Sequence, residues 1–145
     1  MSQVDDFLTK EEEQAIVEAI GNAEKATSGE IRVHIEKTTS LAPFDRALEV
    51  FYNLKMNETK EQNGVLIYLA VEDKTFAICG DKGINDVVAE DFWDNTKNIM
   101  GNHFKSGNFK QGLINGILEA GDQLKKYFPY QENDTDELSN EISKG

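Results

Sequence analysis

An unbroken run of seven apolar residues, Val65–Val71, constrains the fold more than any other part of the sequence. The run is too short for an ordinary globular helix and lacks polar alternation, so it predicts a strand covered on both faces. Glu72–Lys74 then supplies a turn, and Thr75–Cys79 is a second β-type run, so the two runs predict a hairpin. The glycines of Gly80–Gly83 allow a tight turn before a further helix.

The chain before this hairpin predicts a helix, a strand and a second helix. Thr9 and Glu12 form a capping-box pattern ahead of apolar residues at helical spacing. Apolar and polar residues alternate over Glu30–Glu36, as in a strand with one wetter face. Pro43 suits the first turn of the next helix. The expected buried face of that helix comprises Phe44, Ala47, Leu48 and Phe51. A strand, a helix and a strand form a βαβ unit, whose two strands are expected to be parallel.

Two more helices are expected after the hairpin. The first begins near Asp86, and the second is the last long helix before Pro129. Three glycines in the last helix lower its intrinsic helix propensity, so we expect them to permit close approach to another element. They are Gly112, Gly116 and Gly121. These elements predict an α/β fold, a three-layer sandwich in which helices flank a small mixed β-sheet of three or four strands. Residues 1–130 are expected to form one domain, and residues 131–145 an acidic C-terminal tail, extended or mobile.

The composition limits the classes of partner that the protein can bind. With 27 acidic and 15 basic residues the formal net charge is −12, which argues against nucleic acid as a partner because phosphates require a basic patch. The charge is compatible with divalent cations or basic partners, although simple solubility explains it without any partner. No apolar run approaches the roughly 18–20 residues that span a bilayer, and the N-terminus lacks the pattern of a secretory signal. We therefore expect a cytoplasmic protein without a membrane span, in which the single cysteine, Cys79, is a buried thiol.

Acidic residues after the hairpin suggest a metal site. The second hairpin strand ends beside the start of the first, and a parallel neighbouring strand would bring Glu30 to the same edge as Asp81. Asp86, Glu90 and Asp94 are spaced by four residues, so on one helix face they would repel each other, and a cation would relieve that repulsion. Oxygen ligands favour Ca²⁺, Mg²⁺ or Mn²⁺ over zinc. The candidate metal ligands are Asp81, Glu90, Asp86, Asp91 and Glu30. Acids at a helix N-terminus are also stabilising without any ligand.

Other sites are weaker candidates. The carboxyl ends of the parallel strands carry Lys37–Ser40, Asp45, Glu72 and Asp73, and ligands of open α/β sheets bind at such edges, but an ordinary capped loop has the same pattern. His34 and His103 have no second histidine or cysteine at ligand spacing, so both are expected to be structural. The P-loop, the dinucleotide-binding glycine pattern and the nucleophile elbow are all missing from the sequence.

Three short segments stand out in their order along the chain, namely Thr27–Val33, Asn63–Ile67 and Gly80–Ile84. Together they resemble the TPM domain family. That family covers thylakoid-lumen and photosystem-repair proteins, an animal acetylcholine-receptor modulator and many bacterial proteins. Three downstream segments are similar to the short soluble bacterial branch, namely Asp91–Trp93, Gly107–Leu113 and Asp136–Ser143. The resemblance covers nearly the whole chain.

The resemblance implies an α/β sandwich with a divalent-cation site, and a phosphatase activity reported for plant relatives. Asp81 matches the short branch directly, and a frequent family acid six residues after the position of Ile84 corresponds to Glu90. Many relatives carry a signal peptide, a membrane helix or a low-complexity tail, which we do not expect here. Two functions follow as expectations. The first is a cation-binding accessory or interaction module, with a protein partner that the sequence does not identify. The second is a metal-dependent phosphatase, for which Arg32 and Lys82 are the nearest basic candidates.

Overall fold

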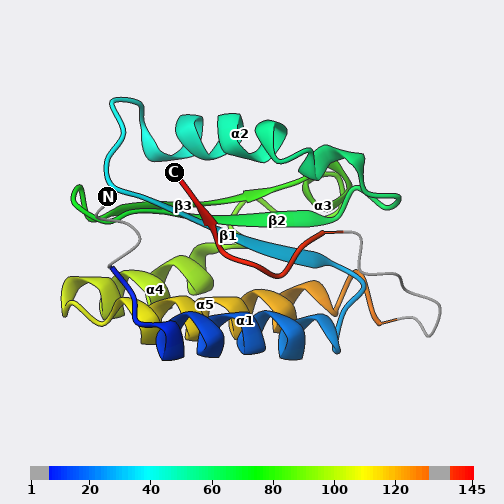
Figure 1. The fold of residues 1–145 in the computed structure, drawn as a ribbon. Coiled ribbons are helices and arrows are strands. Elements are labelled where there is room, and N and C mark those ends of the chain that lie inside the picture. The colour runs from blue at the N-terminus through cyan, green and yellow to red at the C-terminus, as the bar shows by residue number, and fades with distance from the viewer. Residues whose placement is uncertain (1–6, 131–137) are drawn as a thin grey trace.

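The structure is a computed structural model that describes residues 7–130 and 138–145. Helix α2 (Pro43–Asn53) covers one face of a β-sheet, and the helices α1 (Lys10–Glu24), α4 (Asp94–Lys105) and α5 (Phe109–Leu124) cover the other (Figure 1). The short helices η2 (Met56–Glu58) and α3 (Lys82–Asn85) lie in the connections. The expected α/β sandwich of three layers is confirmed.

The sheet has four strands in the order β3-β2-β1-β4. They are β1 (Glu30–Glu36), β2 (Gly64–Ala70), β3 (Thr75–Gly80) and β4 (Ser143–Lys144). β1 runs parallel to β2 and to β4, and β2 and β3 form the antiparallel hairpin. Every residue of β2 is buried, which confirms that the apolar run is a strand covered on both faces. The mixed sheet, with its βαβ unit and hairpin, is therefore confirmed.

The two faces of the sheet bury different side chains. Alternate apolar residues of β1 and β2, such as Ile31 and Val65, pack with the three-helix layer in the larger core. The other face of β2 and β3 packs with Ala47, Val50 and Phe51 of α2. Because successive side chains of a strand point to opposite faces, the even-numbered residues of β1 share the face of α2. That face therefore receives the polar residues of β1.

The glycines of α5 permit close packing, as expected. A methyl group built at Gly121 would lie 2.8 Å from Cβ and 3.2 Å from Cα of Ala23 in α1. At Gly112 and Gly116 it would approach Phe104 and Met100 of α4 to 2.6 Å and 2.5 Å. Three glycines thus allow α5 to lie against both neighbouring helices.

The buried face of α2 is in part wrong in the sequence-based prediction. Ala47 and Phe51 are buried, but Phe44 and Leu48 are 51% and 38% exposed. The physical reason is the rotation of the helix, which turns Arg46 toward a buried carboxylate of β1. Phe44 and Leu48 consequently face outward.

The prediction of a helix from Asp86 is also wrong. α3 ends at Asn85, turns follow, and α4 begins at Asp94. Hydrogen bonds spanning three residues, such as Phe92 N–H to Ala89 C=O at 3.1 Å, hold the turns between the two helices. Trp93 lies against Gly80, where its Nε1 is 3.6 Å from the position of a built Cβ. The chain therefore bends back to β3 instead of continuing as a helix.

The C-terminal end of the chain belongs to the sheet. β4 pairs with His34 and Ile35 of β1, and Leu138 packs against the core beneath α2. The remainder of the expected acidic tail, residues 131–137, lies outside the described residues. The division of the chain at residue 130 stays a prediction. Within the described residues, no helix has the length and apolar character needed to cross a membrane.

Candidate functional site

Asp81 has a buried carboxylate in which one of the two oxygens makes no hydrogen bond. It is the N-cap of α3, and its Oδ1 accepts a hydrogen bond of 2.7 Å from the Lys82 backbone N–H. The residue is 7% exposed, and its Oδ2 has no hydrogen-bond partner. Burial, with the charge of Asp81 as a second cause, raises the pKa of the neighbouring Cys79 thiol to about 11. Asp81 is therefore a buried acceptor with capacity for another ligand.

The turn around Asp81 depends on a close approach of two backbone segments. A Cβ built at Gly83 would lie 2.4 Å from the carbonyl oxygen of Glu61 and 2.5 Å from that of Gln62. The Gly83 N–H donates to the Gln62 carbonyl at 2.9 Å, and the Asp81 N–H donates to the Gly64 carbonyl at 2.9 Å. Glycine at position 83 thus lets the loop before β2 pack against α3. The same packing places the carbonyl oxygens of Glu61 and Gln62 beside Gly83, two residues after Asp81.

Glu30 lies on the same face of the sheet as Asp81, on the far side of Gly64. The register pairs Glu30 with Gly64 in β2, and Asp81 bonds to Gly64 from the other side. The space above Gly64 is filled, because a Cβ built there would lie 3.3 Å from the Met56 carbonyl oxygen and 3.5 Å from Leu138. Glu30 Oε1 accepts a hydrogen bond of 2.9 Å from the Leu138 N–H. Glu30 and Asp81 therefore share a face and an edge but are separated by packed atoms.

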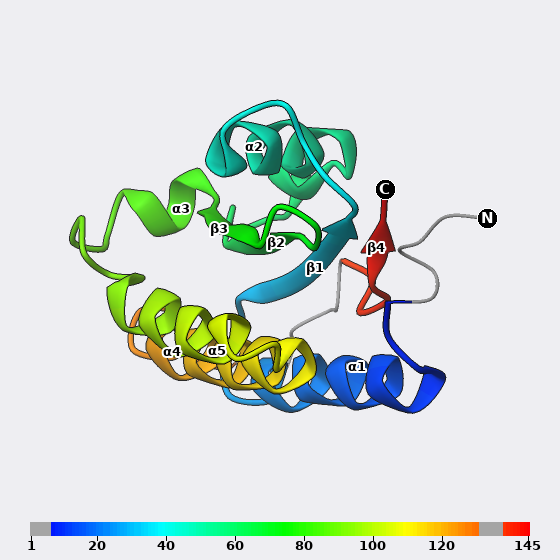
Figure 2. The same ribbon diagram turned by 90° about the vertical axis from the view of Figure 1, so that its left-hand side faces the viewer.

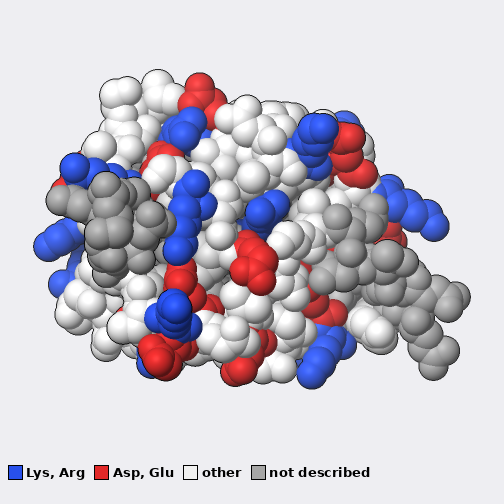
Figure 3. Space-filling model, in the orientation of Figure 1, with Lys and Arg blue, Asp and Glu red and all other residues white. Residues whose placement is uncertain are grey.

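The other three candidate ligands are exposed. Asp86 pairs with Lys82 at 2.6 Å, and Glu90 and Asp91 lie in the turns that follow α3. Because α3 and α4 are separate helices, Asp86, Glu90 and Asp94 do not share one helix face. In the part of the chain that the structure describes, no three His, Cys, Asp or Glu side chains gather closely enough to hold a metal ion. On the face seen in Figure 3, acidic and basic side chains are interspersed.

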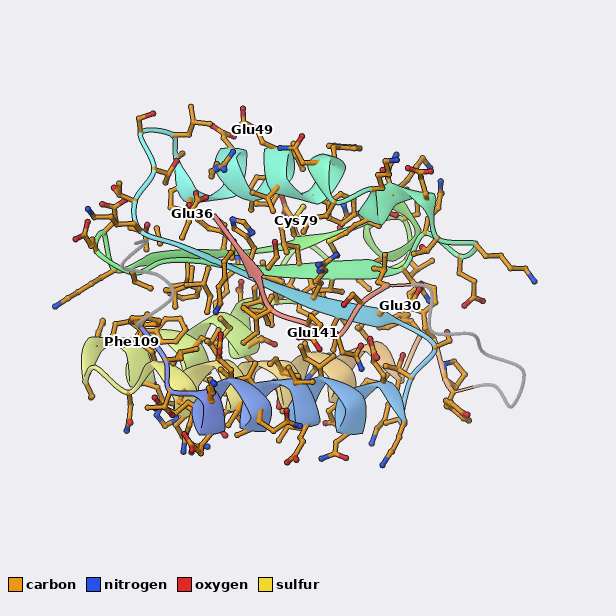
Figure 4. All side chains as sticks on the ribbon, in the orientation of Figure 1. Glu30, Glu36, Glu49, Cys79, Phe109 and Glu141 are labelled. Atoms are coloured by element: carbon orange, nitrogen blue, oxygen red, sulfur yellow. The ribbon has the colours of Figure 1, made fainter. Side chains whose placement is uncertain are left out.

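A buried polar network, which the sequence did not indicate, surrounds Glu36 at the opposite end of β1 from Glu30 (Figure 4). Glu36 is 5% exposed. Arg46 of α2 donates to both of its oxygens, at 2.9 Å and 3.0 Å, and the Tyr68 hydroxyl donates to Oε2. His34 Nε2 lies 3.1 Å from Oε1, and His34 Nδ1 lies 2.8 Å from the Ser143 hydroxyl. The network joins α2, β1, β2 and β4.

The electrostatics of this network follow from its geometry. Burial acts to raise the pKa of Glu36, but hydrogen bonds from Arg46, Tyr68 and His34 outweigh burial and lower that pKa to about 2. Burial lowers the pKa of His34 against the opposing effect of Glu36, and burial with the Glu36 bond raises the pKa of Tyr68. Glu36 is thus held as an anion whose charge Arg46 balances. Alternation in β1 indicated a polar face, but the pairing with Arg46 depends on where α2 lies.

The carboxyl edge of the parallel strands is closed by hydrogen bonds within the chain. The Thr38 hydroxyl donates to Asp73 at 2.7 Å, and the Thr39 N–H donates to the same carboxylate at 2.9 Å. These bonds lower the pKa of Asp73. They tie the loop after β1 to the hairpin turn. Thr38, Thr39 and Asp73, three of the residues predicted there, therefore bond to one another within the chain.

Comparisons with known proteins identify relatives of this chain. Residues 1–123 match the TPM domain. The NMR structure of the BA42 protein from the psychrophilic bacterium Bizionia argentinensis is 68% identical, with a TM-score of 0.91 and coverage of 96% of each chain. No curated protein matches.

Two more distant structures are similar in fold. The N-terminal domain of a protein from P. gingivalis is 17% identical, with a TM-score of 0.69 and coverage of 88% of this chain and 83% of that one. The N-terminal domain of the cg2496 protein from Corynebacterium glutamicum is 12% identical, with a TM-score of 0.66 and coverage of 86% and 78%. At these identities the likeness concerns the fold alone.

Proposed function

Because this chain belongs to the TPM domain family, as its match over residues 1–123 shows, we propose that it acts as an accessory module that binds a divalent cation, Ca²⁺ or Mg²⁺. Asp81 is the anchoring ligand in this proposal. Glu30 lies on the same face of the sheet, but packed atoms separate it from Asp81, so it contributes charge at longer range than a ligand would. Asp86, Glu90 and Asp91 contribute negative charge nearby at the surface. Cation binding would alter the surface formed by the turns after β3, through which the module would contact its partner.

The observation that carries the proposal is the unpartnered Oδ2 of Asp81. A buried carboxylate oxygen without a donor is costly, because the protein does not replace the hydrogen bonds that water would make. A hard cation would replace them, since Ca²⁺ and Mg²⁺ prefer carboxylate, carbonyl and water oxygens. Oxygen atoms of this kind lie on the same turn, since the carbonyl oxygens of Glu61 and Gln62 lie beside Gly83, two residues after Asp81. The donor chemistry fits a hard cation that keeps several water ligands.

The alternative function, a metal-dependent phosphatase, has less support from the basic residues. A phosphate group is usually held by a guanidinium that is free to donate two hydrogen bonds. Of the two basic candidates, Lys82 pairs with Asp86, and Arg32 has a buried Nε that makes no hydrogen bond. Arg46 already donates to Glu36 and to Glu49. An interaction module needs no such group. We therefore favour the module over the hydrolase.

A titration of metal-stripped protein with Ca²⁺ and with Mg²⁺, followed by backbone amide NMR, tests the proposal. Saturable shifts centred on residues 80–91 are expected for the wild type. Asp81→Asn should abolish them while preserving the turn, because asparagine is also a good N-cap and can still accept the Lys82 N–H. Asp86→Asn is the matched control, since it removes one negative charge from an exposed side chain of the same turn.

Two outcomes would contradict the proposal. One is a set of weak shifts scattered over the acidic surface, and the other is a saturable response that survives Asp81→Asn. Turnover of a generic phosphomonoester by the metal-loaded wild type, lost in Asp81→Asn, would favour the phosphatase over the module.

A further inference from the structure

β3 forms one edge of the sheet, opposite the edge that β4 covers (Figure 2). In an antiparallel pair, residues alternate between those that bond to the partner strand and those that turn their N–H and C=O groups away. The Asp81 N–H donates to the Gly64 carbonyl, and the register then assigns Cys79 and Ala77 to the bonded set. Phe76, Ile78 and Gly80 therefore direct their backbone groups outward.

This edge is open over the length of a short strand. Asn85 Nδ2 donates to the Gly80 carbonyl at 3.1 Å and so ends the open stretch at that residue. No other strand of the described residues pairs with β3 on this side. The N–H and C=O groups of Phe76 and Ile78 and the N–H of Gly80 are thus available to an added strand. Exposed edges with such free groups are templates for strand addition.

A cavity of about 480 Å³ follows this edge. Its lining includes Phe76, Ile78 and Gly80 of β3, the residues whose backbone groups point away from β2. Phe44 of α2 lies on one side, and Trp93 and Lys97 lie on the other. The volume falls within the range of about 300–1,000 Å³ that is typical of ligand sites. Phe44 is 51% exposed, and Leu48 and Tyr52 continue the same exposed face of α2 at intervals of four residues. The groove thus combines free backbone groups with apolar side chains.

We propose that this groove binds an extended segment of a partner protein, which adds to β3 as a fifth strand. The free backbone groups at every second residue require an extended chain, and the exposed Phe44 requires apolar side chains on the face directed toward α2. A net charge of −12 opposes a second copy of this chain and favours a segment with basic residues. The occupant is therefore a strand of alternating apolar residues with Lys or Arg beside them. This proposal does not depend on a cation at Asp81.

Selection from a displayed library of random nine-residue peptides, with the full chain as target, supplies the probe. The enriched peptides should alternate apolar residues and carry Lys or Arg. A synthetic copy of the most enriched peptide should shift the amides of residues 76–80 and 93–97. Phe44→Ala should weaken binding of that peptide about tenfold, because it removes exposed apolar contact area. Leu118→Ala, which shortens a 43% exposed side chain on α5, should leave the affinity unchanged.

N-methylated versions of the selected peptide test strand addition without any change to the protein. Methylation of the amides at one set of alternate positions should weaken binding at least about tenfold, since two hydrogen bonds to β3 are lost. Methylation of the other set, which faces solvent, should change the affinity less than about threefold. The proposal is overturned if no peptide is enriched, if both methylated versions bind equally, or if the shifts lie away from β3. A concentration-dependent dimer that shifts the same amides without peptide would assign the edge to a second copy instead.

Discussion

Glu36 carries a buried charge that the fold can tolerate only with its partners in place. The residue is 5% exposed, and its carboxylate accepts hydrogen bonds from Arg46, Tyr68 and His34. Removal of one member of a buried ion pair leaves the other charge without compensation, which costs more than the pair itself contributes. The position of α2 over the sheet therefore depends on this residue.

Glu36→Gln should lower the free energy of unfolding by about 2–3 kcal/mol, because Arg46 loses a charged acceptor while the side-chain volume is unchanged. Urea denaturation followed by circular dichroism measures the loss. Glu49→Gln is the matched control: Glu49 also bonds to Arg46, at 3.0 Å, but its side chain is 54% exposed. Exposed ion pairs contribute at most about 1 kcal/mol, so this variant should change stability little. Equal losses in the two variants would show that burial of Glu36 is not the cause.

Asp81 and Glu36 differ in how far the sequence alone could predict them. Asp81 stands between two glycines at the end of a strand, so its place in a turn follows from neighbouring residues. The partners of Glu36 include Arg46, and the approach of Arg46 depends on the rotation of α2 over the sheet. That rotation was mispredicted at Phe44 and Leu48, so the ion pair could not be inferred. Local patterns thus identified the turn, whereas the network required the tertiary structure.

At the scale of elements, α5 shows how a helix-breaking residue can favour a fold. Glycine costs about 1 kcal/mol relative to alanine within a helix, so its use in α5 needs a compensating contact. At Gly121 that contact is with the Cβ and the backbone of Ala23, which cannot move without shifting α1. The glycines of α5 therefore set the distances from α5 to α1 and α4 in the three-helix layer.

Gly121→Ala should destabilise the protein by about 1–2 kcal/mol, since overpacking of about 1–3 kcal/mol exceeds the gain in helix propensity. Gly101→Ala in α4 is the matched control, because the nearest atom to the added methyl group is 3.6 Å away on Phe76. That variant should be stabilised by up to about 1 kcal/mol. Thermal and urea unfolding of both variants measure the difference. A stabilised Gly121→Ala protein would contradict the argument.

The break between α3 and α4 is a helix boundary that the sequence pattern did not predict. Apolar residues recur at helical spacing through residues 86–99, and the acids Asp86, Glu90 and Asp94 are four residues apart. The sequence therefore indicates one continuous helix. Turns replace its first part, and Trp93 packs against Gly80 beside the end of β3. Tertiary packing outweighs local propensity here. Asp86 and Glu90 consequently lie in turns and Asp94 at the start of α4, so the three acids do not repel one another along one helix face.

β4 contributes to stability through β1. Truncation after residue 137 removes the Leu138 N–H bonded to Glu30, the Ser143 hydroxyl beside His34 and the pairing of β4 with β1. A buried acceptor that loses its partner costs about 1–3 kcal/mol, so a fall of that size in unfolding free energy is expected. Amide exchange should also become faster in β1, and by more than the increase that the lower global stability causes in β2. Unchanged exchange in both strands would indicate that β4 adds no stability.

At the scale of the whole molecule, the fold class could be predicted from short-range patterns. The apolar run of β2, the alternation in β1 and the capping box of α1 each indicate an element, and the βαβ rule then relates two strands. The closing strand β4 could not be foreseen, because a strand of two residues has no pattern of its own. The free edge of β3 likewise becomes visible only once the strand order is known.

The dependence of global stability on pH should reflect both acidic and basic members of the buried network. The folded pKa of Glu36 is about 2 against an ordinary value of 4.5, so the unfolded chain binds a proton first as the pH falls. The stability that Glu36 contributes is therefore complete above about pH 4.5 and is lost as the pH falls toward 2. The pKa of His34 is lowered below 6.5, so its protonation also favours the unfolded chain, from about pH 6.5 downward.

Acidification should thus destabilise the wild type in two successive pH ranges, the first through His34 and the second through Glu36. Single variants should show the contribution of each residue. In His34→Gln, the fall in unfolding free energy that begins near pH 6.5 should be smaller than in the wild type. In Glu36→Gln, the fall between about pH 4.5 and pH 2 should be smaller. Urea denaturation at intervals of half a pH unit measures both differences. Because other carboxylates titrate in the same range, the comparison rests on the variant minus the wild type at each pH. A Glu36→Gln curve parallel to that of the wild type below pH 4.5 would show that the buried anion does not govern acid stability.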